Sequence, residues 1–449
     1  MSTDTQVIKD WLKQHQISEV EVLVPDMTGN ARGKFIPAHQ FLDMGEPKLP
    51  ESIMVQSVTG EYCDEHWELV EPTDTDMILK PDATTMRVVP WAREPTAQII
   101  HDCYRQDGEL HPLSTRNVLR KVLDLYEAEG LKPVVAPEVE FFLIDRNTNP
   151  DHVLIPPNGR SGRRETSRLS YSIDAVAEFE DFVEDMYDYA EAQNLAVDTL
   201  IHENGAAQME INFLHGDAMD LADQVFIFKR TVREAAHKHG IYATFMAKPM
   251  QAECGSALHV HQSMVRADSG ENIFADANGD HTDAFLSYIA GLQHYTPELI
   301  AFYAPNVNSY RRLAPDISAP INLNWGLDNR TTAFRVPESS AAATRVENRF
   351  PGADVNPYLA MAATLASGYL GMKRKLVPSK PHQGTANEDE VEVARSLEEG
   401  LRNLGNSTEI GEVFDPLFLK AFAAVKRDEF EEFNRVISSW EREHLLLQV

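Results

Sequence analysis

Acidic side chains interrupt a segment that otherwise has the composition of a buried strand. Residues 137–144 carry Glu138 and Glu140 two positions apart and end in the apolar run Phe141 to Ile144. A strand points alternate side chains to the same face, so we expect both carboxylates to lie together. Neighbouring buried carboxylates repel each other unless a cation lies between them. An exposed face on an edge strand would explain the same pattern without a cation.

Three further segments collect charged and imidazole side chains in a similar way. They are His259 with His261 on one strand face, Arg345 with Glu347 and Arg349 on another, and Glu203 with Glu210 on the two sides of a turn at Gly205. Taken singly, each could be a set of hydrogen-bonded core or surface residues. Together, five carboxylates and one or two imidazoles without a thiolate favour Mg²⁺ or Mn²⁺. Zinc would recruit more His or Cys.

Arginines supply positive charge around these segments. The candidates are Arg312, Arg330, Arg335, Arg345 and Arg349. Phosphoryl transfer needs cation-bridged phosphates with several arginines nearby, because positioning and charge neutralisation do most of the catalysis. Ordinary surface ion pairs would explain any one of these arginines equally well. The combination favours an enzyme that handles phosphate groups.

The net charge argues against one class of partner. The chain has 41 Lys and Arg against 70 Asp and Glu, a formal charge of −29, whereas binding of nucleic acid would need concentrated positive charge. Cationic ligands are compatible with this charge, although solubility alone could explain it. Three cysteines without metal-type spacing are typical of a reducing compartment, and no signal peptide is recognisable at Met1. The most apolar stretch, 359–370, is shorter than the roughly 20 residues of a membrane span, so we expect a soluble cytoplasmic protein without a membrane partner.

The chain is expected to divide at about residue 112. Residues 1–111 are rich in Pro, Thr and Asp and combine a short helix with strand-like pieces, which predicts a small mixed domain. Residues 112–449 interleave long helices with antiparallel-looking strands, which predicts a larger α+β domain. Helices are expected at 114–129, 175–193, 221–239, 282–303 and 357–373, with two more near the end, and a strand at 139–144.

With these residues in hand, the chain resembles the glutamine synthetase superfamily along nearly its whole length. The resemblance lies in 24–34 (VPDMTGNARGK), 137–141 (PEVEF), 202–210 (HENGAAQME), 248–249 (KP), 255–261 (GSALHVH), 308–313 (NSYRRL), 328–337 (DNRTTAFRVP), 345–351 (RVENRFP) and 356–359 (NPYL). It implies a small β-grasp N-terminal domain and a catalytic domain whose antiparallel strands form a funnel surrounded by helices. It also implies a ring-shaped homo-oligomer, expected to be a dodecamer, with active sites between subunits.

The resemblance further implies the ligands: ATP, glutamate, an amine and two to three Mg²⁺ or Mn²⁺ ions. The first cation would be held by Glu140, Glu203 and Glu210, and the second by Glu138, His259 and Glu347. The implied ATP contacts are His261, Ser263, Arg335 and Arg345. Glutamate and its acyl phosphate would be held by Gly255, Arg312, Arg330 and Arg349, of which Arg312 and Arg349 also act in catalysis. Asp26 of a neighbouring subunit would receive the amine and help to deprotonate it, with Tyr171 beside it.

Two positions depart from the pattern of the relatives that use ammonia. Ser318 stands where a loop Glu takes a proton from the attacking nitrogen. A hydroxyl is shorter, uncharged and a poor base at neutral pH, and it leaves room for a larger amine. Cys254 stands where an Asn helps to hold glutamate. Asp316 could replace the missing Glu as a base or as an anchor for a distal ammonium. The segment 377–398 contains no Tyr, so control by adenylylation is not expected.

We therefore predict an ATP-dependent glutamate–amine ligase that forms a γ-glutamyl amide through γ-glutamyl phosphate. The residues of its motifs resemble most those of the γ-glutamylpolyamine synthetase branch, so the expected acceptor is putrescine or another polyamine. The alternatives are glutamine synthetase using ammonia, and a ligase for a small monoamine such as ethanolamine. A catalytically silent relative of the fold is a remote alternative, because such proteins tend to lose cation ligands and all six candidates are present here.

Overall fold

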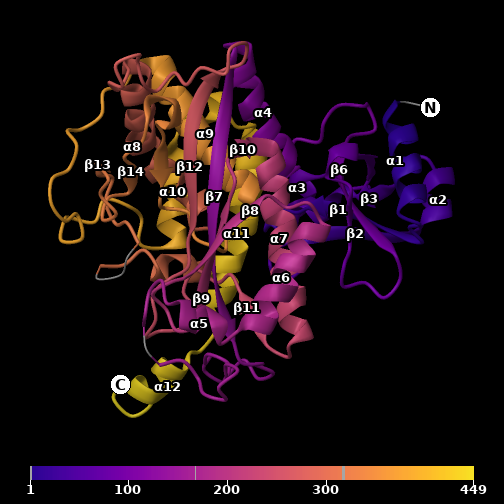
Figure 1. The fold of residues 1–449 in the computed structure, drawn as a ribbon, viewed down its shortest axis with the longest axis horizontal. Helices are drawn as coiled ribbons and strands as arrows, with labels where there is room; N and C mark the ends of the chain where they lie inside the picture. Colours follow the sequence, from indigo (N-terminus) through magenta and orange to yellow (C-terminus); the bar gives the residue numbers. More distant parts are fainter. Residues whose placement is uncertain (1–2, 167, 316–318) are drawn as a thin grey trace.

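The computed structural model describes residues 3–166, 168–315 and 319–449. Two β-sheets organise this part of the chain, one formed by residues before position 105 and one by residues after position 130 (Figure 1). Figure 1 shows the first sheet set to one side of the long strands β7 and β12, which run side by side through the larger body. Helices surround the larger sheet. The predicted α+β class is thereby confirmed.

The smaller sheet has the strand order β2-β1-β6-β4-β3, and β5 pairs with β6. Its strands are β1 (Glu19–Pro25), β2 (Ala31–Pro37), β3 (Lys48–Pro50), β4 (Asp76–Pro81), β5 (Arg87–Val88) and β6 (Thr96–Tyr104). β1 is antiparallel to β2 and parallel to β6. Apolar side chains of β1 pack in one core with Ile8 and Leu12 of α1 (Thr3–Gln14) and Phe41 of α2 (Ala38–Asp43). The β-grasp description of this part stays a prediction.

The larger sheet has the strand order β13-β14-β15-β12-β7-β9-β8, and β10 and β11 both pair with β7. Its strands are β7 (Leu131–Ile144), β8 (Val197–His202), β9 (Gln208–Phe213), β10 (Gly216–Asp217), β11 (Tyr242–Thr244), β12 (Leu258–Arg266), β13 (Trp325–Leu327), β14 (Phe334–Val336) and β15 (Val346–Asn348). Among the described residues, its pairings are antiparallel except that of β13 with β14. The antiparallel sheet expected for the catalytic part is therefore present.

β7 is much longer than the strand predicted at 139–144. Proline cannot donate to a β ladder, and Pro133 and Pro137 therefore argue against an earlier start. The structure nevertheless continues β7 back to Leu131, with Pro133 opposite Met264 and Pro137 opposite Val260 of β12. The long strand reaches the whole length of β12, which makes β7 the central strand of the sheet.

The predicted helices are present, one of them as two elements, and the short helices α2 and α3 (His66–Leu69) were not predicted. The helices of the described residues are α4 (Thr115–Ala128), α5 (Ile173–Ala177), α6 (Glu180–Ala192), α7 (Ala218–Lys238), α8 (Asp283–Tyr303), α9 (Pro357–Arg374), α10 (Leu397–Asn406), α11 (Pro416–Asn434) and α12 (Ser439–Leu445), besides α1, α2 and α3. The helix predicted at 175–193 is wrong as one element: it breaks after Ala177, where Phe179 leaves helical geometry to bury its ring. Three helices, rather than two, follow residue 390. None of the described helices has the length and apolar character that a bilayer crossing requires.

A buried arginine of α4 joins the smaller sheet to a helix of the larger body. Arg116 of α4 is 1% exposed, and its guanidinium contacts Asp82 and Asp102 beside the smaller sheet and Asp223 of α7. The Nη2 atom lies 2.6 Å from Asp82 Oδ2 and 2.9 Å from Asp223 Oδ2. Tyr358 of α9 donates its hydroxyl to the same Asp223 over 2.6 Å. This network fixes the smaller sheet against the helices of the larger body.

Candidate active site

The strand registers of the larger sheet bring the predicted residues together. On β7, Glu138 lies opposite His259 of β12, and Glu140 lies opposite Glu210 of β9. β15 pairs with the other edge of β12 and adds Glu347. Because alternate residues of a strand share a face, side chains from four strands converge on one side of the sheet. The alternating carboxylates of β7 are thus part of a larger cluster.

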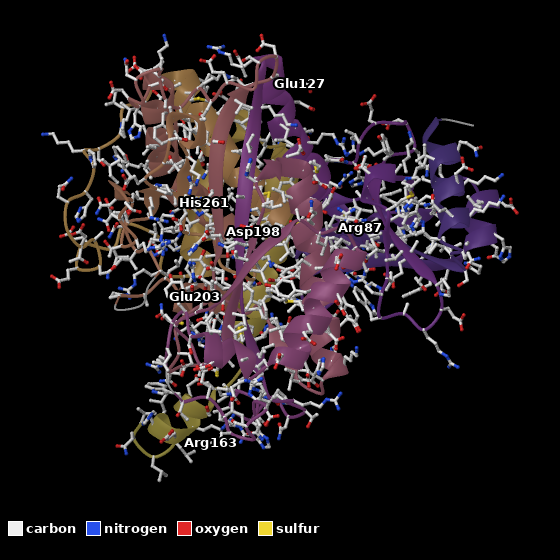
Figure 2. The ribbon with its side chains drawn as sticks, in the orientation of Figure 1. Arg87, Glu127, Arg163, Asp198, Glu203 and His261 are labelled. Atoms are coloured by element: carbon white, nitrogen blue, oxygen red, sulfur yellow. The ribbon has the colours of Figure 1, made fainter. Side chains whose placement is uncertain are left out.

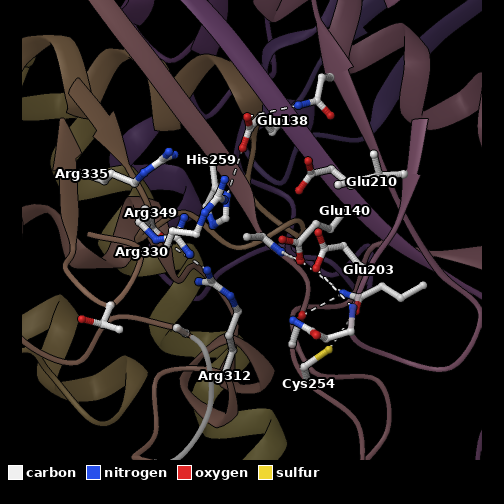
Figure 3. Close-up of a pocket in the computed structure, with 18 of the residues that line it drawn as sticks. Glu138, Glu140, Glu203, Glu210, Cys254, His259, Arg312, Arg330, Arg335 and Arg349 are labelled. Carbon is white, nitrogen blue, oxygen red and sulfur yellow. Dashed lines mark hydrogen bonds and ion pairs between the residues drawn. The ribbon is translucent and has the colours of Figure 1, made fainter. Parts of the chain in front are cut away.

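A pocket of about 370 Å³ opens on this face, within the size range of small-molecule sites. Figure 3 shows carboxylates along one wall and arginines along the other. The predicted residues that line this first pocket are Glu138, Glu140, Tyr171, Glu203, Glu210, Gly255, His259, Arg312, Arg330, Arg335 and Arg349. Facing walls of opposite charge suit an anionic ligand that is bridged to cations.

Glu347 lies behind the first pocket and contacts three of the residues that line it. Its side chain is 1% exposed, and its Oε1 lies 2.6 Å from Arg349 Nη1 and 3.4 Å from His259 Nδ1. Its Oε2 lies 3.1 Å from Arg335 Nη1. One buried carboxylate therefore positions two arginines and one imidazole, which makes it an essential part of the cluster whether or not it touches a cation.

Two sets of ligand atoms lie close enough to share a cation. The first set is Glu138, Glu210 and His259, the second is Glu138, His261 and Glu347, and within each set the atoms lie within 4.8 Å of one another. Glu138 belongs to both. The resemblance grouped Glu210 with Glu140 and Glu203, whereas the structure places an oxygen of Glu210 within reach of the Glu138 carboxylate. Burial lowers the pKa of His259 to about 4, so its imidazole is neutral at pH 7, the form that binds cations.

The carboxyl groups fall into two classes by their pKa. Burial, reinforced by neighbouring carboxylates, raises the pKa of Glu140 to about 8 and that of Glu210 to about 10, and it also raises the pKa of Glu203. Burial acts on Glu138 and Glu347 too, but the imidazoles and a neighbouring arginine outweigh it and hold both pKa values below the usual range. A divalent cation would remove the repulsion that raises the first three values. The donor set, carboxylate oxygens with few imidazoles, therefore fits Mg²⁺ or Mn²⁺.

A second pocket, of about 340 Å³, adjoins the first at Glu138 and Asn212, which line both. Three of the predicted ATP contacts, His261, Ser263 and Arg345, line this second pocket, together with Asp198. Figure 2 shows His261 and Asp198 near the middle of the larger body. Arg345 Nε lies 3.4 Å from His261 Nδ1, and His261 Nε2 lies 3.0 Å from Glu138 Oε1. The fourth predicted ATP contact lines the first pocket instead.

Arg312 is held against the first pocket by backbone carbonyls. It is 3% exposed, and its Nη1 and Nη2 donate to the carbonyl oxygens of Phe350 (2.8 Å) and Arg349 (3.0 Å). Gly255 packs on its side chain, where a Cβ would lie 2.6 Å from Arg312 Cγ and 2.7 Å from the carbonyl oxygen of Ala247. Burial lowers the pKa of Arg312 to about 10, which leaves it charged at neutral pH.

β9 carries two residues of the site that the sequence analysis missed. Gln208 and Asn212 flank Glu210 at two-residue spacing, and both line the first pocket. Gln208 Nε2 donates to Glu140 Oε2 and Asn212 Nδ2 donates to Glu138 Oε1, each over 3.2 Å. Strand alternation around Glu210 was the signal that could have found them.

Asp26 lies outside the first pocket of its own chain, in the turn between β1 and β2. Its side chain is 0% exposed, and Oδ1 accepts the backbone N–H groups of Thr28 and Asn30, both over 2.9 Å. Oδ2 accepts Arg32 Nε over 2.7 Å. Within its own chain this carboxylate holds the β1–β2 turn, and its predicted part in receiving the amine at a neighbouring subunit's site stays a prediction.

The expected acceptor end of the first pocket is only partly described. Ser318 and Asp316 lie outside the described residues. Ala319, which follows them, lines the first pocket, and Tyr171 lines it with 61% of its surface exposed. Arg330 is exposed and makes no hydrogen bond or ion pair with a described residue.

The chain is similar in sequence and in fold to known ligases. Residues 112–445 match the family model of the glutamine synthetase catalytic domain. The chain is 33% identical to the gamma-glutamylputrescine synthetase PuuA of Escherichia coli (strain K12), with 99% of this chain and 95% of the relative covered. It is also 33% identical to a glutamate–isopropylamine ligase of Pseudomonas sp. (97% and 96% covered) and to a glutamine synthetase of Methanococcus voltae (83% and 84%). A solved GmaS/ADP complex superposes with a TM-score of 0.84 at 25% identity, covering 99% of this chain and 100% of that one, and GmaS without ligand with a TM-score of 0.83 at 25% identity (97% and 98%).

Proposed function

We propose, on the premise that this chain belongs to the glutamine synthetase family of ATP-dependent ligases, that it joins the side-chain carboxylate of glutamate to an organic amine through a γ-glutamyl phosphate. The observation that carries this proposal is the meeting of two pockets at one carboxylate, Glu138. Phosphoryl transfer requires the nucleotide and its acceptor to approach each other in line, and adjoining pockets allow this.

The second pocket is the proposed nucleotide site. Arg345 and His261 line it and lead to Glu138 through contacts of 3.4 and 3.0 Å. The triphosphate would run from this pocket toward Arg335 and Arg349, which line the first pocket. Glu347 holds both arginines in place. Their positive charge is therefore preorganised for a phosphate group that reaches from the second pocket into the first.

The carboxylates and His259 would hold the divalent cations. The proposed ligands are Glu138, Glu140, Glu203, Glu210, His259 and Glu347, with His261 beside them. Bound cations would neutralise phosphate charge and lower the barrier to its transfer. The contribution of the protein is to keep these oxygens and the imidazole in place before ligands arrive.

Glutamate would bind at the Arg312 end of the first pocket. Arg312 is fixed by two backbone carbonyls, and Gly255 lets the loop approach its side chain. The guanidinium of Arg312 would stabilise the negative charge that develops on the acyl phosphate when the amine attacks its carbonyl carbon. Asp26 of a neighbouring subunit, or a nearby group, would take the proton of the attacking nitrogen, phosphate would leave with the electron pair of the broken C–O bond, and the amide remains.

The proposed acceptor is putrescine or another polyamine. Support comes from Ser318, which replaces the Glu of ammonia-using relatives and leaves room for a larger amine, and from the similarity to a gamma-glutamylputrescine synthetase. One observation favours a second candidate, an amine with an uncharged alkyl tail. Arg330 lines the pocket without a described partner and would repel a distal ammonium.

An acceptor panel tests the proposal. ATP-dependent phosphate release and the mass of the amide product would be measured with glutamate and ammonium, putrescine, spermidine, ethanolamine or isopropylamine. We expect putrescine or spermidine to give the highest kcat/KM. Ammonium as the best acceptor would overturn the amine proposal, and the absence of metal-dependent phosphate release with every acceptor would overturn the ligase.

Substitution of Arg330 separates the two acceptor candidates. In Arg330→Met, removal of the positive charge should raise kcat/KM for putrescine relative to isopropylamine if a distal ammonium enters the pocket. An equal effect on both amines would place the distal end of the acceptor elsewhere.

We further propose a cytoplasmic homo-oligomer, a dodecameric ring with active sites between subunits. The three free cysteines suit a reducing compartment. Three neighbouring large apolar side chains, Leu169, Tyr171 and Ile173, are 59%, 61% and 81% exposed. A neighbouring subunit that covered them would remove this apolar surface from water. Light scattering on the eluting protein would test this, and a monomer with full activity would refute it.

A further inference from the structure

Gln208 has an amide whose orientation is fixed by its neighbours. Its Oε1 accepts the backbone N–H of Gly205 over 2.9 Å and the thiol of Cys254 over 2.8 Å. Both of these groups act as donors toward it, so the oxygen of the amide must face them and the NH₂ group must face the other way. The thiol and the Gly205 N–H therefore favour the same orientation of the amide.

The opposite side of the same amide meets three acceptors. Gln208 Nε2 has two hydrogens to donate and lies 3.2 Å from Glu140 Oε2, 3.0 Å from the carbonyl oxygen of Gly255 and 3.2 Å from Ser256 Oγ. The side chain is fully buried. An inverted amide would turn its oxygen toward the Glu140 carboxylate and the Gly255 carbonyl, which would cost several hydrogen bonds in a site of low dielectric.

We propose that Gln208 is a positioning residue for the acyl donor, and that Cys254 sets the orientation in which it works. The amide links β7, through Glu140, to the loop of Gly255. In the proposed function, Glu140 holds a cation and Gly255 adjoins glutamate, so the inference rests on that function. Figure 3 shows Cys254 at one end of the carboxylate wall and Glu138 at the other. The thiol thus acts at the glutamate end, away from the nucleotide pocket.

The contact also explains the departure at position 254. An Asn at this place in relatives helps to hold glutamate, and a thiol has only one hydrogen to donate. In this chain that hydrogen is directed to Gln208 rather than into the first pocket. Cys254 therefore contributes to glutamate binding through the orientation of Gln208 and the Gly255 carbonyl.

Three variants test the inference. Cys254→Ser keeps one donor toward Oε1, Cys254→Ala removes it, and Gln208→Glu keeps the shape of the side chain but replaces the NH₂ donors by an oxygen. The readouts are KM for glutamate and for ATP, and calorimetric binding of glutamate to the nucleotide-free protein. Thermal unfolding of each variant shows whether the fold is retained.

The expected results follow the number of hydrogen bonds that each variant loses. Cys254→Ser should bind glutamate within about 2-fold of the parent protein, Cys254→Ala about 5- to 10-fold more weakly, and Gln208→Glu at least about 100-fold more weakly. KM for ATP should change less than about 2-fold in both Cys254 variants, because the nucleotide pocket is remote from the thiol. Rescue by serine is the signature of positioning by a donor.

Two outcomes would overturn the inference. One is unchanged glutamate binding in Cys254→Ala, and the other is a parallel rise of both KM values in Cys254→Ala and Cys254→Ser, which would indicate a general packing defect. Failure of the proposed function would look different, because the parent protein would then show no glutamate-dependent phosphate release.

Discussion

Glu140 and Glu210 lie directly opposite each other across β7 and β9, where like charges normally destabilise a sheet. Both side chains are less than 10% exposed. Burial and neighbouring carboxylates raise the pKa values of both, so the chain keeps an arrangement that costs stability. The cations of the proposed function would offset this cost by neutralising the cluster to which both carboxylates belong.

The first prediction concerns the pH dependence of stability without divalent cation. A carboxyl whose pKa is higher in the folded than in the unfolded chain stabilises the fold while protonated, and this stability is lost as pH rises through the folded value. Between pH 6.5 and 8, Glu210→Gln should therefore gain stability relative to the parent protein by about 1.4 kcal/mol per pH unit. Denaturant unfolding with a chelator present measures this.

Groups outside this pair titrate in both proteins, so the difference isolates the pair. Addition of Mg²⁺ or Mn²⁺ should stabilise the parent protein more than Glu210→Gln. A stability difference that stays constant with pH would show that the pKa of Glu210 is not raised in the folded chain.

The second prediction concerns the close approach at Gly255. A methyl group at this position would collide with the Arg312 side chain and the Ala247 carbonyl, so Gly255→Ala should displace Arg312 and reduce kcat/KM for glutamate about 100-fold or more. Gly405→Ala is the matched control, because a Cβ there meets no atom within 4 Å. Steady-state kinetics of both variants would decide; equal activity would mean that the loop can yield.

The third prediction concerns Arg116, which joins the smaller sheet to a helix of the larger body. Arg116→Met leaves Asp82, Asp102 and Asp223 without their buried partner, and it should lower the free energy of unfolding by about 3 to 5 kcal/mol. Arg120→Met removes a half-exposed contact with Asp102 and should cost less than about 1 kcal/mol. Equal losses in the two variants, measured by denaturant unfolding, would contradict the special role of Arg116.

The fourth prediction separates the two roles considered for Asp26. If it holds the β1–β2 turn, Asp26→Asn should weaken the contact with Arg32 and cost about 1 to 3 kcal/mol of stability. KM for the amine should stay unchanged in the folded protein. An amine KM that rises about 10-fold with unchanged stability, a change of about 1.4 kcal/mol in binding, would restore the role in amine capture.

Some of this site could be read from local patterns. Glu138 and Glu140 were recognisable because a two-residue spacing puts both on one face of a strand, and the family segments supplied their partners. The family itself and the α+β class are confirmed. The assignment of individual ligands to ATP, glutamate and cations stays a prediction.

Other features depend on contacts between distant segments. Glu140 and Glu210 become neighbours only through the β7–β9 register, which sequence spacing does not specify. Arg116 is buried because carboxylates 14, 34 and 107 residues away reach it. The prolines of β7 misled the strand boundary, since their missing donors are tolerated there by the surrounding sheet.

Two side chains, the carboxylate of Glu138 and the amide of Asn212, line both pockets. A ligand in one pocket that changes the charge or the orientation of the Glu138 carboxylate therefore changes the environment of a ligand in the other pocket. Thermodynamic linkage then requires that each ligand changes the binding affinity of the other ligand by the same factor. We expect a substitution of Glu138 to change the affinity for the ligands of both pockets, because its side chain lines both.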